Sequence, residues 1–212
     1  MFAARDNNVD AIKKLIAAGA DVNGRNHLGS TPLMWAASAG SIDAVRCLLA
    51  AGSEVNARTG QGKTALSLTI EYFSPNHNEQ NKNAFVLVVR ALIASGANVR
   101  SREDIGLTPL LWAAAAENKD FASELIDAGA DVNMKGRVRI RVHQYLAVTP
   151  LIYSIINGTD QKSETLEAVK LLLERGADVN ARDSRGRTAL EWAEKGKNDE
   201  IVNILRNTGA RD

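Results

Sequence analysis

The sequence predicts an all-α fold in which one pair of helices is repeated along the chain. Two short motifs alternate: a Thr-Pro-Leu or Thr-Ala-Leu triplet, and a Gly-Ala-Asp-Val-Asn segment or a close variant of it. Because each copy packs mainly against its neighbours, a fixed repeat of this kind predicts a solenoid. The triplets begin at Thr31, Thr64, Thr108, Thr149 and Thr188, and the second motif begins at Gly19, Gly52, Gly96, Gly129 and Gly176.

The residues of one repeat account for both of its helices. Threonine is a good N-cap because its hydroxyl accepts a hydrogen bond from a free N–H group of the first turn. The proline that often follows suits the first helical position. We therefore expect a short Ala-rich helix over 33–39. A second helix over 42–51 has Val45, Leu48 and Leu49 on one face at helical spacing, and a glycine ends each helix.

The connection between repeats is a tight turn, as at Asn26–Gly29 and Asp183–Gly186, where Asn or Asp comes first and Gly fourth. Together with the triplet and the helices, this pattern resembles the ankyrin repeat over essentially the whole chain. The resemblance implies antiparallel helix pairs stacked side by side, with β-hairpin fingers projecting from them. The family's usual His after the triplet is absent, so its hydrogen bonds are not expected here. In its place stand Met34, Ser67, Leu111, Ile152 and Glu191.

We expect six repeats in a single domain over residues 1–212. The first triplet lies 33 residues before the second, and the later spacings exceed this period by 11, 8 and 6 residues. The first copy begins part-way through a repeat, which leaves open whether the native chain extends before Met1. The expected repeats cover about 1–30, 31–63, 64–107, 108–148, 149–187 and 188–212.

Composition gives few hints about location or partners. The formal net charge is +1, so the chain as a whole makes no strong case for a nucleic acid or a membrane surface as its partner. No apolar run reaches the length of a membrane-spanning helix. The single cysteine, Cys47, is expected to be buried and inert. The compartment stays open, with the cytoplasm favoured and a removed signal peptide not excluded.

No group of residues predicts catalysis, a cofactor or a metal site. His27, His77 and His143 lack the spacing of metal ligands, and no nucleophile with a matching base is evident. Ala57–Thr64 loosely matches a phosphate-binding loop, but the strand that should precede that motif and the longer helix that should follow it are missing. We therefore expect a protein that is not an enzyme and binds no cofactor.

Three insertions interrupt the repeats. Ser74–Lys82 and Thr159–Glu164 are polar, and we expect them to form surface loops or to lengthen the helices beside them. The third, Met134–Val148, is different, because Arg137–His143 alternates basic and apolar residues without exception. This is the period of a strand with one cationic and one apolar face. We expect a longer finger hairpin whose apolar residues pack on the helices and whose arginines point outward.

The fingers are strongly basic although the chain is nearly neutral. They contain eleven basic residues against three acidic ones, a local balance of +8. This asymmetry predicts an acidic partner surface or phosphate groups. The alternative is an edge strand that charge merely protects from unwanted pairing. The basic residues are Arg58, Lys63, Arg100, Arg102, Lys135, Arg137, Arg139, Arg141, Arg182, Arg185 and Arg187.

The resemblance implies that a partner lies across the concave surface made by finger tips and first helices. We expect a monomeric, non-enzymatic scaffold that binds another protein through this face and the inserted basic finger, without inserting into a membrane. One alternative is a phosphorylated ligand or nucleic acid bound along the basic fingers, and another is an accessory targeting domain of a larger protein. The expected apolar anchors are Leu28, Tyr72, Ile105, Leu107 and Ile156, and the expected steering charges are Arg137, Arg139, Arg141, Arg185 and Arg187.

Overall fold

The computed structural model describes residues 1–73, 79–116, 118–141, 144–158 and 163–211, without the side chains of 79, 80, 140 and 141. The chain divides into two compact units, unit 1 (Met1–Asp104) and unit 2 (Ile105–Asp212). Parts of both polar insertions (74–78 and 159–162), His77, His143 and the side chain of Arg141 lie outside the described residues.

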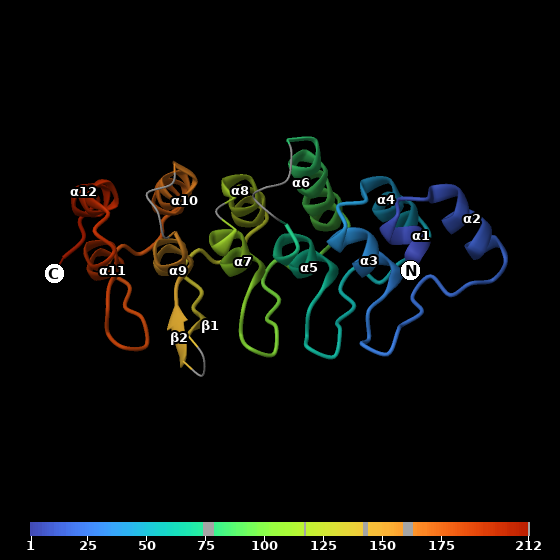
Figure 1. Cartoon of the computed structure of the whole chain (residues 1–212), viewed down its shortest axis with the longest axis horizontal. Coiled ribbons are helices and arrows are strands. Elements are labelled where there is room, and N and C mark those ends of the chain that lie inside the picture. The colour runs from blue at the N-terminus through green and yellow to red at the C-terminus, as the bar shows by residue number, and fades with distance from the viewer. Residues whose placement is uncertain (74–78, 117, 142–143, 159–162, 212) are drawn as a thin grey trace. The chain divides into compact units, whose positions relative to one another are not determined.

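Each unit is built from helix pairs, which confirms the predicted fold class (Figure 1). The helices of unit 1 are α1 (Phe2–Arg5), α2 (Val9–Ala17), α3 (Pro32–Ser38), α4 (Ile42–Ala50), α5 (Ala65–Glu71) and α6 (Glu79–Ala94). Unit 2 contains α7 (Pro109–Ala115), α8 (Lys119–Asp127), β1 (Gly136–Arg141), β2 (Gln144–Val148), α9 (Pro150–Asn157), α10 (Ser163–Glu174), α11 (Ala189–Lys195) and α12 (Asp199–Asn207).

The threonine of every triplet caps a first helix, as the sequence predicts. Each hydroxyl accepts a hydrogen bond from the backbone N–H three residues later, over 3.2–3.4 Å. This bond satisfies one of the free donors of the first turn. The five threonines are Thr31, Thr64, Thr108, Thr149 and Thr188.

Three residues that replace the usual histidine complete this cap from the other side. Ser67 Oγ accepts from the Thr64 N–H at 3.1 Å, and Glu191 Oε2 accepts from the Thr188 N–H at 2.7 Å. The Met34 sulfur approaches the Thr31 N–H at 3.4 Å. A reciprocal capping box therefore satisfies the backbone at these helix starts.

Two of the second helices are longer than the others. Helices α4, α8 and α12 each have 9 residues, whereas α6 has 16 and α10 has 12. Helix α6 begins inside the first polar insertion and α10 begins inside the second. The expectation that these insertions lengthen neighbouring helices is confirmed for their described residues.

The asparagine of the Gly-Ala-Asp-Val-Asn motif joins successive repeats within each unit, a role that the sequence did not reveal. In unit 1, Asn23 donates from Nδ2 to the Gly52 carbonyl at 3.3 Å, and its Oδ1 accepts from the Glu54 N–H at 2.8 Å. One amide thus pairs both a donor and an acceptor of the following repeat. The same pair of bonds is made by Asn56 to Gly96 and Asn98, by Asn133 to Gly176 and Asp178, and by Asn180 to Gly209 and Arg211.

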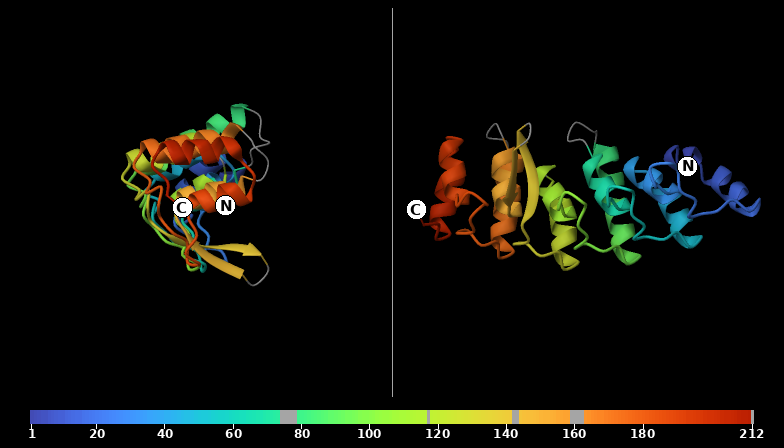
Figure 2. Two further views of the ribbon diagram at one scale, coloured as in Figure 1. Left: turned by 90° about the vertical axis from the view of Figure 1, so that its left-hand side faces the viewer. Right: turned by 90° about the horizontal axis from the view of Figure 1, so that it is seen from below.

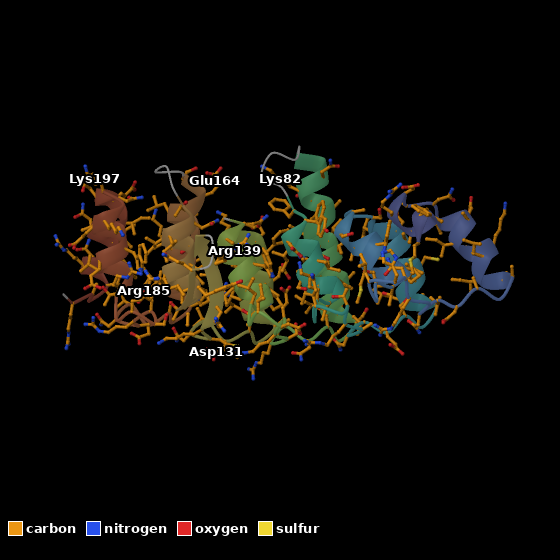
Figure 3. All side chains as sticks on the ribbon, turned by 60° about the horizontal axis from the view of Figure 1, so that its bottom comes forward. Lys82, Asp131, Arg139, Glu164, Arg185 and Lys197 are labelled. Carbon is orange, nitrogen blue, oxygen red and sulfur yellow. The ribbon has the colours of Figure 1, made fainter. Side chains whose placement is uncertain are left out.

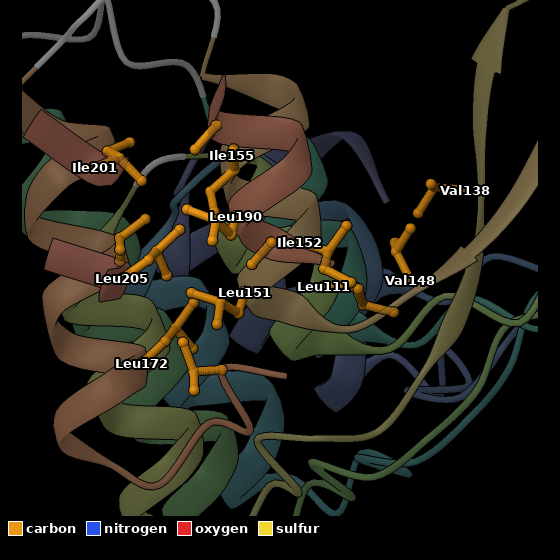
Figure 4. Close-up of a cluster of buried hydrophobic side chains, with 14 of the residues drawn as sticks. Leu111, Val138, Val148, Leu151, Ile152, Ile155, Leu172, Leu190, Ile201 and Leu205 are labelled. Carbon is orange, nitrogen blue, oxygen red and sulfur yellow. The ribbon is translucent and has the colours of Figure 1, made fainter. Parts of the chain in front are cut away.

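The core of unit 2 continues from the helices into the hairpin (Figure 4). Val138 of β1 and Val148 of β2 are buried in the same apolar cluster as Leu111 and Leu151. Leu107 belongs to this cluster too, with only 4% of its surface exposed. The predicted exposure of Leu107 is therefore wrong, because Leu107 belongs to an apolar cluster that also includes Val138, Leu146 and Val148 of the hairpin.

Candidate interaction surface

The inserted segment forms the predicted hairpin. Strands β1 and β2 pair antiparallel, with Val138 opposite Leu146 and Arg139 opposite Tyr145. Val138 and Leu146 are buried, whereas Arg137, Arg139 and Tyr145 are exposed. Figure 2 shows the hairpin running alongside α9, and β2 packs against this helix. The two faces predicted from the alternation of basic and apolar residues are thus confirmed for the described side chains.

The solvent face of the hairpin combines positive charge with an aromatic ring. The Arg137 guanidinium lies over the Tyr145 ring, 5.1 Å from its centre. Arg139 is directly opposite Tyr145 in the pairing of the two strands. A guanidinium stacked on an aromatic face keeps its in-plane N–H donors available for a carboxylate or phosphate. We call Arg137, Arg139 and Tyr145 the hairpin face.

The base of the hairpin is held on both sides. On the β2 side, the Ser184 N–H donates to the Ala147 carbonyl at 3.0 Å, and the Ala147 N–H donates to Ser184 Oγ at 3.1 Å. On the β1 side, Gly136 lies so close to Gly106 and Leu111 that a Cβ atom would overlap both. These contacts place the exposed Arg185, in the turn that contains Ser184, beside the hairpin. Figure 3 shows Arg139 and Arg185 within unit 2.

Arg187 does not project freely into solvent, although the sequence predicted that it would act as an exposed steering charge. Its Nε donates to Asp183 Oδ2 at 3.1 Å, and its guanidinium lies 3.8 Å from the centre of the Trp192 ring. Asp183 is buried and also accepts from the Trp192 indole N–H at 3.0 Å and from the Arg185 and Arg187 backbone N–H groups. Arg187 is therefore chiefly part of a structural cluster that fixes the last finger.

Asp183 is the ionised centre of this cluster. Its burial acts to raise its pKa. The hydrogen bonds from the Arg187 N–H, the Trp192 indole and the Arg185 N–H, with the charge of Arg187, outweigh that effect and hold the pKa below its usual value. Hydrogen bonds to a carboxylate favour its charged form. The protein is thus more stable when Asp183 is ionised.

Acid should remove the contribution of Asp183 to stability. Since its folded-state pKa is lowered, that contribution is fully present above the unfolded-state pKa of about 3.9 and is lost as the pH falls through the folded value. The difference in unfolding free energy between the wild type and Asp183→Asn should be constant at about pH 5–7 and shrink below about pH 4. Urea unfolding at a series of pH values measures it. A difference that stays unchanged down to about pH 2 would contradict this assignment.

A pocket of about 600 Å³ opens between α9 and α11. Ile156, one of the expected apolar anchors, lines it together with Trp192 and Ile201. Lys195 and Lys197 are also among the lining residues. Sequence reasoning assigned no site role to Trp192 or Lys197. The sequence does mark Lys197 as unusual, because it is a lysine at the position after a first helix where an earlier repeat has a glycine, Gly40.

The remaining predicted anchors are exposed on their own units. Leu28 is 62% exposed and Tyr72 is 61% exposed in unit 1, and Ile105 is exposed in unit 2. Lys63, the residue that suggested a phosphate-binding loop, pairs with Glu71 at 2.5 Å. Helix α5 after that loop has only 7 residues. Lys63 is thus explained by an internal ion pair.

Among the described residues, no cluster of three or more His, Cys, Asp or Glu side chains is arranged to hold a metal ion. None of the helices there has both the length and the apolar character needed to cross a membrane. Cys47 is a free thiol that is partly rather than fully buried.

Family comparisons agree with the repeat architecture. The family model described as "Ankyrin repeats (3 copies)" matches residues 1–82 and 134–211, and the one described as "Ankyrin repeat" matches residues 105–137. An ankyrin repeat domain from Acinetobacter baumannii superposes with a TM-score of 0.81 at 28% identity, over 99% of this chain and 97% of that one. A second match is a chain in the structure of a predatory endopeptidase of Bdellovibrio bacteriovorus in complex with an immunity protein. It superposes with a TM-score of 0.73 at 25% identity, over 97% of this chain and 95% of that one.

Curated relatives are much longer than this chain. The E3 ubiquitin-protein ligase hecd-1 of Caenorhabditis elegans is 31% identical over 126 residues, and the mouse ankyrin repeat, SAM and basic leucine zipper domain-containing protein 1 is 27% identical over 137 residues. These matches cover 58% and 64% of this chain but only 4% and 26% of the relatives. The chain therefore corresponds to a limited part of each.

Proposed function

Because the chain belongs to the ankyrin-repeat family, we propose that it is a non-enzymatic module that binds a partner protein with an acidic surface. Ankyrin repeats generally mediate protein–protein interactions. The observation that carries the proposal is the hairpin face, where the Arg137 guanidinium lies over the exposed ring of Tyr145 and Arg139 is paired with Tyr145 across the strands. Arginine and tyrosine are enriched among the residues that dominate binding energy at protein interfaces.

Charge makes the hairpin face selective. Residues 134–148 contain four basic residues and no Asp or Glu. Arg185 lies beside β2, since its turn is hydrogen-bonded to Ala147. A positive surface without internal carboxylates attracts an acidic partner and repels a basic one. The charge of the face thus supports an acidic protein surface as the partner.

Exposed apolar residues supply the second part of the proposed contacts. In unit 1 these are Leu28 and Tyr72, and in unit 2 the exposed residue is Ile105, with the partly buried Ile156 beside the core. Apolar side chains within a polar rim are the usual centre of a protein interface.

The length of the curated relatives supports a role as one module of a larger protein.

Reversing the charge of the hairpin face tests the proposal. The variant Arg137→Glu/Arg139→Glu should weaken binding of a protein partner by about 10- to 100-fold, or about 1.4–2.7 kcal/mol, because like charges would then face each other across the interface. The partner is captured from lysate on the immobilised wild-type chain and identified by mass spectrometry. Its dissociation constant is then measured for both proteins at several salt concentrations.

Lys13→Glu/Lys14→Glu is the matched control, because it makes the same change of charge on the exposed face of α2. If both variants lose affinity for the partner equally, the effect comes from the net charge of the chain and not from the hairpin. If the hairpin variant keeps its affinity, the hairpin does not bind the partner. A DNA oligonucleotide that binds with an affinity falling steeply with salt would instead favour the nucleic-acid alternative.

A further inference from the structure

Lys197 adopts a backbone conformation that lysine rarely takes. Its φ is +55°, in the left-handed region, and among the described residues the one other non-glycine residue with positive φ is Asn7. Both stand just after a first helix, where Gly40 has φ +69° in another repeat. Glycine takes this conformation without strain, and asparagine tolerates it better than other residues do. A lysine here costs stability that a glycine would not, which suggests that its side chain has a use.

The pocket between α9 and α11 shows what that use can be. Lys197 and Lys195 line it together, and no Asp or Glu is among its described lining residues. The Lys195 ammonium group lies 5.1 Å from the centre of the Trp192 ring. Ile156 and Ile201 extend the apolar wall. The pocket thus combines apolar walls with two positive charges.

We propose that this pocket receives an apolar side chain from an acidic segment of the partner protein, while neighbouring carboxylates of that segment pair with Lys195 and Lys197. The inference rests on the proposed function and names a second contact for the same partner. Charge complementarity selects the acidic segment, and the apolar wall selects its anchoring side chain. An inorganic anion would use the two lysines but leave Trp192 and Ile156 uncovered.

The position of the pocket fits a segment that also reaches the hairpin. Helix α9 contributes Ile155 and Ile156 to the pocket, and the hairpin runs alongside the same helix (Figure 2). Figure 3 shows Arg139 and Lys197 on this unit. One extended acidic segment that follows α9 is therefore the simplest partner element for both basic groups of unit 2.

A short peptide tests the pocket without the natural partner. The probe is a blocked pentapeptide with a central phenylalanine flanked by two glutamates on each side. The chain has three tryptophans, so its indole N–H signals can be followed by two-dimensional NMR and assigned with Trp192→Phe. We expect saturable movement of the Trp192 signal, with little change in those of Trp35 and Trp112. Absence of that movement would overturn the inference.

Two altered peptides separate the two halves of the inference. Replacing the glutamates with glutamines should weaken binding, because the carboxylates are lost. Replacing the phenylalanine with alanine should weaken it too, because the apolar anchor is lost. Equal binding of the glutamine peptide would overturn the role of the lysines, and equal binding of the alanine peptide would reduce the site to an anion site.

Variants of Lys197 separate binding from stability. Lys197→Gly should raise the urea midpoint, because it relieves the backbone strain, and yet weaken the peptide about two- to fivefold, as expected for loss of one exposed charge pair. Lys197→Gln should weaken the peptide equally while keeping the strain. Lys13→Gln, which removes a charge far along the sequence in unit 1, should leave the affinity unchanged. A Lys197→Gly variant with wild-type affinity would overturn the inference.

The outcomes distinguish this inference from the proposed function. If the hairpin variant loses the captured partner but the peptide does not move Trp192, the pocket inference fails and the proposed function stands. If the peptide binds as expected while the hairpin variant keeps the partner, the pocket stands and the hairpin does not.

Discussion

Replacing Asp183 with asparagine should lower the free energy of unfolding by about 2–3 kcal/mol at neutral pH. Asparagine has nearly the same shape, and its oxygen can still accept from the Arg185 and Arg187 backbone N–H groups. Its amide nitrogen, however, would face Arg187 Nε and the Trp192 indole N–H, both of which are donors. Two donors would lose their acceptor, and the Arg187 charge would lose its counter-ion at a site where the Asp183 side chain is fully buried.

Urea unfolding at pH 7 measures this loss. Asp178→Asn is the matched control, because Asp178 is exposed and makes a similar bond to the Asn180 N–H at 2.9 Å that an asparagine oxygen can keep. We expect the control to change stability by less than about 0.5 kcal/mol. If both substitutions lower the free energy of unfolding equally, the bonds from Asp183 to Arg187 Nε and to the Trp192 indole add no stability beyond the backbone bonds of the turn.

Gly136→Ala should destabilise the protein by about 2–3 kcal/mol, because the new methyl group has no space at the base of the hairpin. A Cβ atom at this residue would lie 2.6 Å from the Gly106 carbonyl oxygen, and it would also overlap the Leu111 side chain. The Leu111 side chain can shift, but the Gly106 oxygen belongs to the backbone. Either β1 or the neighbouring finger must therefore move, which disturbs the packing of Val138.

Thermal or urea unfolding measures this second effect, and circular dichroism in the aromatic region reports whether Tyr145 changes its surroundings. Gly196→Ala is the control, because its Cβ would lie 3.4 Å from its nearest neighbours and its φ is −76°. Alanine there should be neutral or slightly stabilising. A Gly136→Ala protein as stable as the wild type would mean that the base of the hairpin is loosely packed.

Local interactions explain why so much of the fold could be predicted. The caps of Thr31 and Thr188 use the backbone N–H three residues later, so four consecutive residues contain both partners of the bond. The hairpin was predictable because alternation of basic and apolar residues has the period of a strand. The exposed Arg137 and the buried Val138 follow directly from that period.

The misplaced site residues depend on contacts between distant segments. Leu107 was expected to be exposed because it precedes a triplet, like the polar Ser30. Val148 occupies the same place and is buried, so the apolar character of both residues was the better guide. The partial burial of Arg187 could not be predicted, since it depends on how the Trp192 ring and the Asp183 carboxylate meet in three dimensions.

The bridging asparagine also bears on how such an array can change length in evolution. Asn133 and Asn180 each bond to the repeat that follows, through a glycine carbonyl and a backbone N–H that belong to the repeated motif itself. A duplication that copies one whole repeat copies the asparagine and its acceptor together. Duplication of a repeat that carries this asparagine therefore adds a junction with the same two hydrogen bonds.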